Sequence, residues 1–141
     1  MKFRHGAIIG LAVACSGPQI LPSAHGARGV QYVRTMSGSV RCLILAEGAA
    51  SADTAGVTCE SGAFQQAPAG ADQVRVNAAG HFTWDAANIG GGTGANDLTL
   101  AYGQTYHLLG WTINPTSDGT RFTNDATGHG MFVSLQNVNS F

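Results

Sequence analysis

Acid–base chemistry in this 141-residue sequence centres on His129 and its neighbours. Asp125 precedes the histidine in a turn-rich stretch, and Ser134 follows it. A Ser/His/Asp catalytic set needs the histidine within hydrogen-bond reach of the serine, together with a carboxylate that orients the ring. An odd number of positions separates His129 from Ser134, which sends their side chains to opposite faces of a regular strand. We therefore expect the His129 imidazole to cap its own turn, and we retain His129, Asp125 and Asp85 as acid–base candidates for a hydrolase.

Zinc binding is the second chemistry to consider, because His81, His107 and His129 lie in separate predicted strands or turns. A zinc site takes three or four nitrogen, sulfur or carboxylate ligands that converge in space. No pair of these histidines has the i, i+2 or i, i+4 spacing that brings two ligands together locally. We interpret His107 as a histidine at the edge of the core and expect no metal cofactor.

The glycine-rich stretch at residues 88–96 is similar to two known binding motifs. It is not a phosphate-binding loop, because no Lys-Ser/Thr ending follows the glycines. It resembles one nonapeptide calcium repeat, with Asn96 at the usual aspartate position and Leu98 at the apolar one. Such repeats bind calcium only when they are stacked, and the sequence has a single copy. We therefore expect a flexible connection here and no bound cation.

A disulfide is predicted between Cys42 and Cys59. These two cysteines remain once the first 26 residues are removed, and an even number in an oxidising compartment favours pairing. Closing a loop of this length stabilises a fold by about 3 kcal/mol in the chain-entropy model. Metal ligation would require further thiolates or clustered histidines, which the sequence lacks.

Residues 1–26 have the features of a signal peptide. Basic residues at the start precede an apolar run at residues 7–15, and the small residues Ala24 and Gly26 stand at the −3 and −1 positions. The apolar run is shorter than the roughly 20 residues that span a bilayer. These features predict export with cleavage between Gly26 and Ala27. The competing interpretation is lipidation of Cys15, after a weak lipobox, which would tether the domain to a membrane.

The charge of the remaining chain excludes some classes of partner. Two of the seven basic residues lie in the first 26, which leaves five against eight carboxylates, spread without runs. Binding to nucleic acid needs clustered basic charge, and binding to anionic lipid needs a basic amphipathic segment. We therefore expect no nucleic-acid partner, and membrane contact only if Cys15 is lipidated.

Short apolar runs separated by turn signals predict an all-β fold. The predicted strands cover residues 40–46, 56–60, 73–77, 81–85, 97–102, 106–113, 120–123 and 131–138. The last three form a three-stranded antiparallel meander, closed by turns around Asp118-Gly119 and at residues 124–128. We predict one β domain at residues 40–141, a small antiparallel sandwich or partly open barrel with one disulfide, preceded by a mobile leader at residues 27–39.

Three segments of the meander resemble small exported proteins and lipoproteins of mycobacteria and related actinobacteria. The segments cover residues 110–113, 119–125 and 127–131. The similarity extends from about Arg41 to the end of the sequence and includes both cysteines and the segment at residues 82–84. The resemblance implies a location in the cell envelope or the medium, and it carries over no catalytic residue.

The function expected from these features is a non-enzymatic binding or structural role in the cell envelope or outside the cell. The expected partner is an envelope lipid, a glycan or a protein. Two alternatives remain open: a hydrolase that acts on envelope components, and a secreted effector or antigen that binds a host protein.

Overall fold

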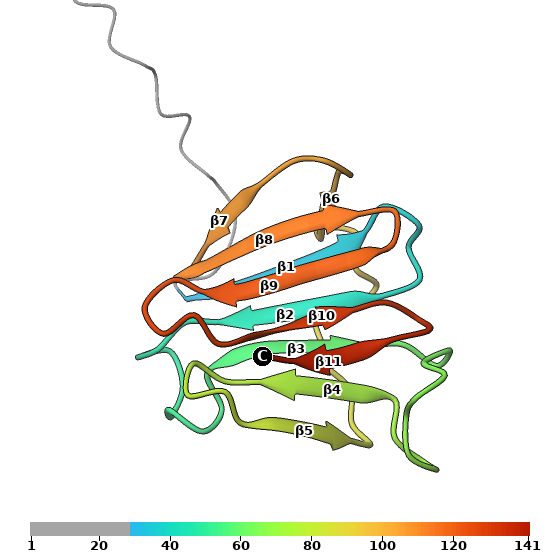
Figure 1. Ribbon diagram of the computed structural model, residues 1–141, viewed down its shortest axis with the longest axis horizontal. Coiled ribbons are helices and arrows are strands. Elements are labelled where there is room, and N and C mark those ends of the chain that lie inside the picture. Colours follow the sequence, from blue (N-terminus) through green and yellow to red (C-terminus); the bar gives the residue numbers. More distant parts are fainter. Residues whose placement is uncertain (1–28) are drawn as a thin grey trace, which may run out of the picture.

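The computed structural model describes residues 29–141, which form two β-sheets packed face to face (Figure 1). The predicted signal peptide at 1–26, the cleavage site between Gly26 and Ala27 and the lipidation candidate Cys15 lie outside the described residues. Neither sheet closes on itself, so the fold is a sandwich and not a barrel. Within residues 29–141 no helix is long and apolar enough to cross a bilayer.

The larger sheet has six strands in the order β5-β4-β3-β2-β1-β6. Adjacent strands in this sheet are antiparallel, except for β1 and β6, which are parallel. The strands are β1 (Val30–Thr35), β2 (Arg41–Leu45), β3 (Gly56–Glu60), β4 (Gln73–Val76), β5 (Phe82–Asp85) and β6 (Leu98–Leu100).

The smaller sheet is a meander of five antiparallel strands in the order β11-β10-β9-β8-β7. It lies in front of the larger sheet in Figure 1, with the strands of both sheets running in similar directions. The strands are β7 (Tyr106–Leu108), β8 (Trp111–Thr116), β9 (Gly119–Asn124), β10 (Gly130–Val133) and β11 (Val138–Ser140).

Alternation along the strands places one face of each sheet in a shared core. In the six-stranded sheet, Val33, Ile44 and Val57 are fully buried, and Ile113 and Phe122 meet them from the meander. The predicted disulfide joins β2 to β3, where Cys42 and Cys59 stand directly opposite each other in the ladder. Both cysteines lie in the core, so the bridge ties the two central strands from inside.

The predicted mobile leader at residues 27–39 is wrong, because Val30–Thr35 forms β1 between β2 and β6. The segment gave no clear apolar alternation because Gln31 and Thr35, which lie on the same face as the buried Val33, are polar. Tyr32 and Arg34 point away from the core and hydrogen-bond the main chain of the glycine-rich loop.

The predicted three-stranded meander has five strands, because two of the predicted strands each contain a turn. Residues 106–113 fold back at Leu109-Gly110, where φ is 53° and 85° respectively. Two successive positive φ angles make a type I′ hairpin turn, which is usually signalled by asparagine, aspartate or glycine in the first position. Residues 131–138 turn at Ser134, whose hydroxyl donates to the Asn137 carbonyl.

Candidate functional site

The three acid–base candidates lie in different places. Asp85 is on β5 and faces Arg75 at 3.8 Å. The His129 ring does not cap its own turn as expected; its Nδ1 lies 3.3 Å from the main-chain oxygen of Phe141. The Ser134 hydroxyl belongs to the turn before β11. The residues proposed for a hydrolase are therefore not assembled into a catalytic set.

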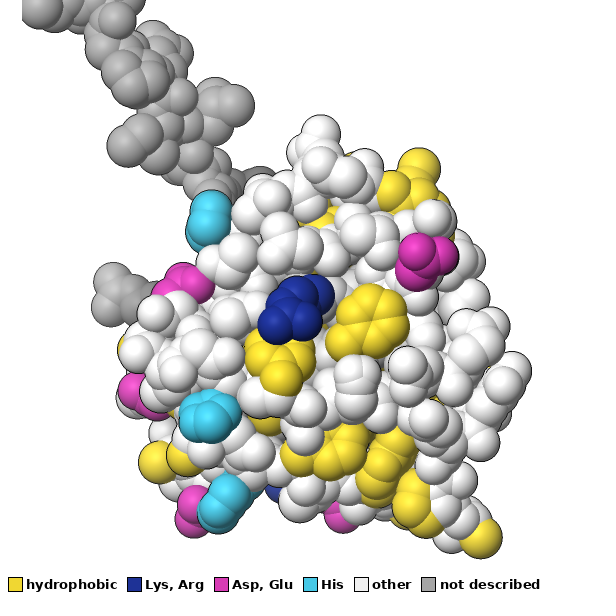
Figure 2. Space-filling model, viewed as in Figure 1, with side chains coloured by type: hydrophobic (Ala, Val, Ile, Leu, Met, Phe, Trp, Pro, Cys, Tyr) yellow, Lys and Arg dark blue, Asp and Glu magenta, His cyan; other side chains and the backbone are white. Residues whose placement is uncertain are grey.

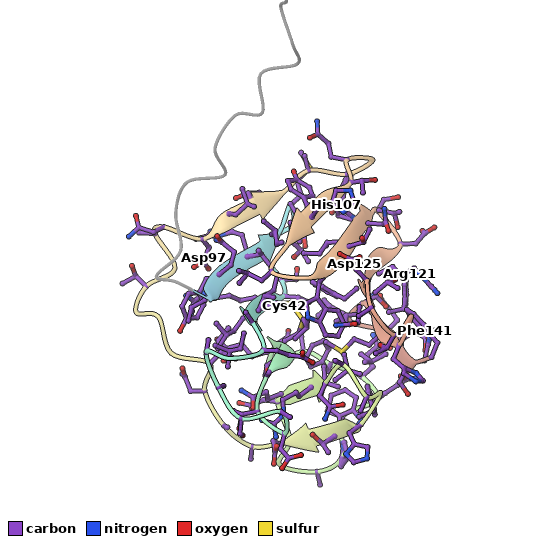
Figure 3. The ribbon with its side chains drawn as sticks, turned by 90° about the vertical axis from the view of Figure 1, so that its left-hand side faces the viewer. Cys42, Asp97, His107, Arg121, Asp125 and Phe141 are labelled. Carbon is purple, nitrogen blue, oxygen red and sulfur yellow. A yellow bond between two sulfur atoms is a disulfide. The ribbon has the colours of Figure 1, made fainter. Side chains whose placement is uncertain are left out.

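Asp125 instead lies in a row with Thr112 and His107 on the outer face of the meander (Figure 3). The Thr112 hydroxyl donates to Asp125 Oδ1 at 2.5 Å, and His107 Nδ1 lies 3.2 Å from the same hydroxyl. His107 and Thr112 are paired residues of β7 and β8. In a Ser/His/Asp set the histidine stands between hydroxyl and carboxylate, whereas here the hydroxyl stands between the other two. The row ties the β7 edge to the turn after β9.

No metal site is formed by the described residues: they contain no group of three or more His, Cys, Asp or Glu side chains close enough to hold an ion. His107 is on the edge strand β7, while the ring of His129 lies against Gly80 in the turn before His81. The three histidines of the zinc hypothesis are thus not brought together.

The predicted flexible connection at residues 88–96 is instead a loop held against the outer face of the six-stranded sheet. Side chains of that sheet donate hydrogen bonds to four main-chain oxygens of the loop. Tyr32 binds Ile89, Arg41 binds the next two residues, and Arg34 binds Gly94 at 2.5 Å. The loop is therefore fixed through its backbone.

Asp97 completes this attachment, because Arg41 engages both of its carboxylate oxygens. Its two carboxylate oxygens accept from Arg41 Nε at 2.5 Å and Nη2 at 3.0 Å, and its side chain is 3% exposed. Hydrogen bonds from Arg41 to Asp97 raise the pKa of the guanidinium above its ordinary value. The guanidinium therefore stays charged, and the ion pair works as a clamp between β2 and the residue that precedes β6.

A patch of two aromatic rings and one arginine lies on the outer face of the meander. The Arg121 guanidinium stacks on the Phe141 ring, 3.6 Å from its centroid. Phe132 stands opposite Arg121 in the ladder and extends its ring over Gly119. We call Arg121, Phe132 and Phe141 the outer-face patch. Figure 2 looks onto this face and shows a cationic side chain near its centre, between two apolar side chains.

Arg121 differs from Arg34, Arg41 and Arg75 because no oxygen of residues 29–141 accepts a hydrogen bond from it or forms an ion pair with it. Arg41 and Arg75 each lie within 4 Å of a carboxylate, and Arg34 donates to a main-chain oxygen. Among residues 29–141 neither a carboxylate nor a carbonyl oxygen pairs with Arg121, which is exposed. Its five donors are available to a ligand.

Uncharged polar side chains surround the outer-face patch. They alternate with core residues along β8, β9 and β11 and include Thr112, Asn114, Thr123 and Asn139. The face thus combines flat apolar rings, one free cation, hydroxyls and amides. Such a surface can bind a ligand by stacking and hydrogen bonding.

Sequence reasoning missed this patch, although part of its signal was present. Alternation in the predicted strand at 120–123 places Arg121 on the face opposite Thr120 and Phe122, which are buried. The stacking of Arg121 on Phe141 has no local signal, because the two residues meet only through the pairing of β9, β10 and the chain beyond β11.

No protein-family model, curated protein or solved structure matches this chain. The outer-face patch, the clamped loop and the end of the sandwich are the features from which a function can be proposed.

Proposed function

We propose that this protein is exported and binds a polysaccharide that carries carboxylate groups, without catalysis, through the outer-face patch. The observation that carries the proposal is Arg121, an exposed cation without a carboxylate partner in residues 29–141, stacked on an aromatic ring. A planar guanidinium binds a carboxylate through two parallel hydrogen bonds. The other expected partners, a lipid or a protein, are less well matched to a flat face of this composition.

The neighbouring side chains support a sugar ligand. Phenyl rings give large apolar contact area with few rotamers, which suits the C–H faces of sugar rings. Threonine and asparagine both donate and accept hydrogen bonds, which suits hydroxyl groups. A nucleic acid would require several cations along its phosphates, whereas this patch has one.

Export is supported by the signal-peptide features of residues 1–26 and by the resemblance to small exported proteins and lipoproteins. The disulfide is compatible with an oxidising compartment. Cleavage between Gly26 and Ala27 is the proposed processing, and lipidation of Cys15 is its alternative. The intact mass of the protein from a related actinobacterial host distinguishes the two. A mass that starts at Ala27 supports release, and one that starts at Cys15 with acyl chains supports anchoring.

The binding proposal is tested by isothermal titration with polygalacturonate and with the same polymer after reduction of its carboxylates. We expect binding to the acidic polymer and at least tenfold weaker binding to the reduced one. Arg121→Gln should weaken binding to the acidic polymer about tenfold or more, because a charge-assisted hydrogen bond contributes about 1.5–3 kcal/mol.

Arg75→Gln is the matched control for this substitution. It removes the same charge from the outer face of the other sheet, where Arg75 is half-buried and faces Asp85. We expect its affinity to stay within twofold of the parent protein. Equal weakening by both substitutions would assign the binding to overall charge and would reject the outer-face patch as the site.

A further inference from the structure

A pocket opens between the two sheets at the end of the sandwich where the β2–β3 and β7–β8 connections meet. It has a volume of about 280 Å³. The six-stranded sheet and the meander both contribute to an apolar wall, which is formed by Leu45, Ala46, Ala55, Ala78, Leu109 and Ala126. The pocket is separate from the outer-face patch, since it lies on the inner side of the meander.

Trp111 and Asn124 both line this pocket, and each carries a side-chain hydrogen-bond donor. The two residues are opposite each other in the β8–β9 ladder and point inward, with 2% and 7% of their surface exposed. Asn124 Oδ1 accepts from the main-chain N–H groups of Ala126 and Thr127, both at 3.1 Å, which fixes the orientation of the amide. Its Nδ2 group therefore points away from that turn.

Among residues 29–141, no oxygen accepts a hydrogen bond from the Trp111 indole N–H or from Asn124 Nδ2. No fully enclosed side-chain polar atom of the described chain lacks a partner. Both donors therefore keep some contact with solvent, and the two residues that carry them line this pocket. A ligand that displaces water from these donors must supply an acceptor, because a buried donor without one is costly, so the pocket favours a ligand with an acceptor oxygen.

The rim of the pocket is acidic. Glu47 and Asp125 line it, and Asp125 uses one oxygen to accept from Thr112, so its second oxygen remains available. Two carboxylates at the rim repel an anionic ligand. The donors at the floor in turn repel a cation. The pocket therefore suits a neutral group that has an acceptor oxygen and a donor N–H.

We propose that this pocket is a binding site for the acetamido group of an N-acetylated sugar. The methyl group contacts the alanine side chains, and the carbonyl oxygen accepts from Trp111 and Asn124. The amide N–H donates to a rim carboxylate, and the sugar hydroxyls lie at the polar rim. An acyl chain or an acetylated lysine would place an apolar stem beside Glu47 and Asp125, which is unfavourable.

The proposal is tested by titrating the ¹⁵N-labelled protein with N-acetylglucosamine, glucose and sodium acetate, each as a separate probe. We expect N-acetylglucosamine to shift the Trp111 indole and Asn124 amide signals saturably, with at least tenfold weaker effects of glucose and acetate. The Trp84→Phe variant assigns the indole signal. Equal shifts with glucose, or no shift with any probe, would overturn the proposal.

Two substitutions at this end of the sandwich localise the binding. Ala126→Leu fills the pocket from an exposed turn and should weaken N-acetylglucosamine binding at least tenfold. Ala79→Leu, in a neighbouring exposed turn outside the pocket, should leave it within twofold. Unchanged binding by Ala126→Leu would reject this site. Arg121→Gln should not affect it, and a loss with that variant would assign the sugar to the outer-face patch instead.

Discussion

Leu109 occupies a backbone position that asparagine, aspartate or glycine normally takes. Its φ of 53° is the one positive value among the non-glycine residues of the described chain, and the side chain is 37% exposed. The left-handed conformation costs a residue with a Cβ about 1 kcal/mol or more. We expect Leu109→Asn to raise the free energy of unfolding by about 1 kcal/mol, measured by urea denaturation.

Leu109→Ala is the control for this prediction. Asparagine tolerates the left-handed region because its short polar side chain can hydrogen-bond to the local main chain. Alanine removes the same leucine side chain but has no such polar group, so it should gain no stability. If both variants were stabilised equally, exposure of the leucine and not its backbone conformation would be the cause.

Asp97 is the residue whose loss should most weaken the attachment of the glycine-rich loop. Asp97→Asn removes the closer of the two carboxylates beside the Arg41 guanidinium, at a side chain that is 3% exposed. We expect a loss of about 2 kcal/mol of stability, because hydrogen bonds to charged groups contribute about 1.5–3 kcal/mol. Asp118→Asn, in the exposed turn before β9, should change stability by less than about 0.5 kcal/mol, as surface substitutions usually do. Similar midpoints in urea for the two variants would contradict the clamp.

Single residues of the candidate site were only partly predictable from the sequence. His129 and Asp125 were selected by type and spacing, and both make hydrogen bonds, but with partners on other strands. The free donors of Trp111 and Asn124 depend on which acceptors the fold leaves nearby. Which acceptors lie near a given donor can be determined only once the pairing of the strands is known.

At the level of the elements, the disulfide links β2 and β3 across a sequence separation of 17 residues. Cys42 and Cys59 are 1% and 0% exposed, so a reductant reaches the sulfur atoms only when the sheet opens. We expect no gain of two hydrogens in intact mass with dithiothreitol in buffer, and full reduction in denaturant. Reduction under native conditions would show that β2 and β3 separate readily.

Replacing both cysteines by alanine is the complementary measurement. It should lower the free energy of unfolding by about 3 kcal/mol, the value expected for closing a loop of this length. The folded spectrum of the variant should be retained, because β2 and β3 keep their ladder.

Strands with clear apolar content in their own sequence were predicted well. Strands that depend on partners distant in the sequence were not. Residues 56–60 were predicted as a strand and form β3 with those bounds. By contrast, β1 was predicted as a leader, because the partners of its outward side chains lie about sixty residues away in the loop. The β7–β8 turn was missed because leucine stands where the turn type favours other residues.

At the scale of the whole molecule, the two sheets share one core and should unfold together. The two tryptophans report on them separately, since Trp84 is on β5 and Trp111 is on β8. We expect the Trp84→Phe and Trp111→Phe variants to show single fluorescence transitions in urea, each coincident with the far-ultraviolet circular dichroism of the same variant. A fluorescence transition that precedes the loss of strand signal would indicate that one sheet melts first.

Two glycines, Gly119 and Gly130, lie beneath the aromatic rings of the outer-face patch. Phe132 covers Gly119 and Phe141 covers Gly130, so each ring occupies space where a side chain would otherwise stand. Moving either ring would expose main chain to solvent, so we expect the patch to keep its shape when the proposed ligand binds. Little conformational entropy is then lost on association. Ligands whose shape already fits should associate rapidly, and those that require the face to rearrange should be excluded.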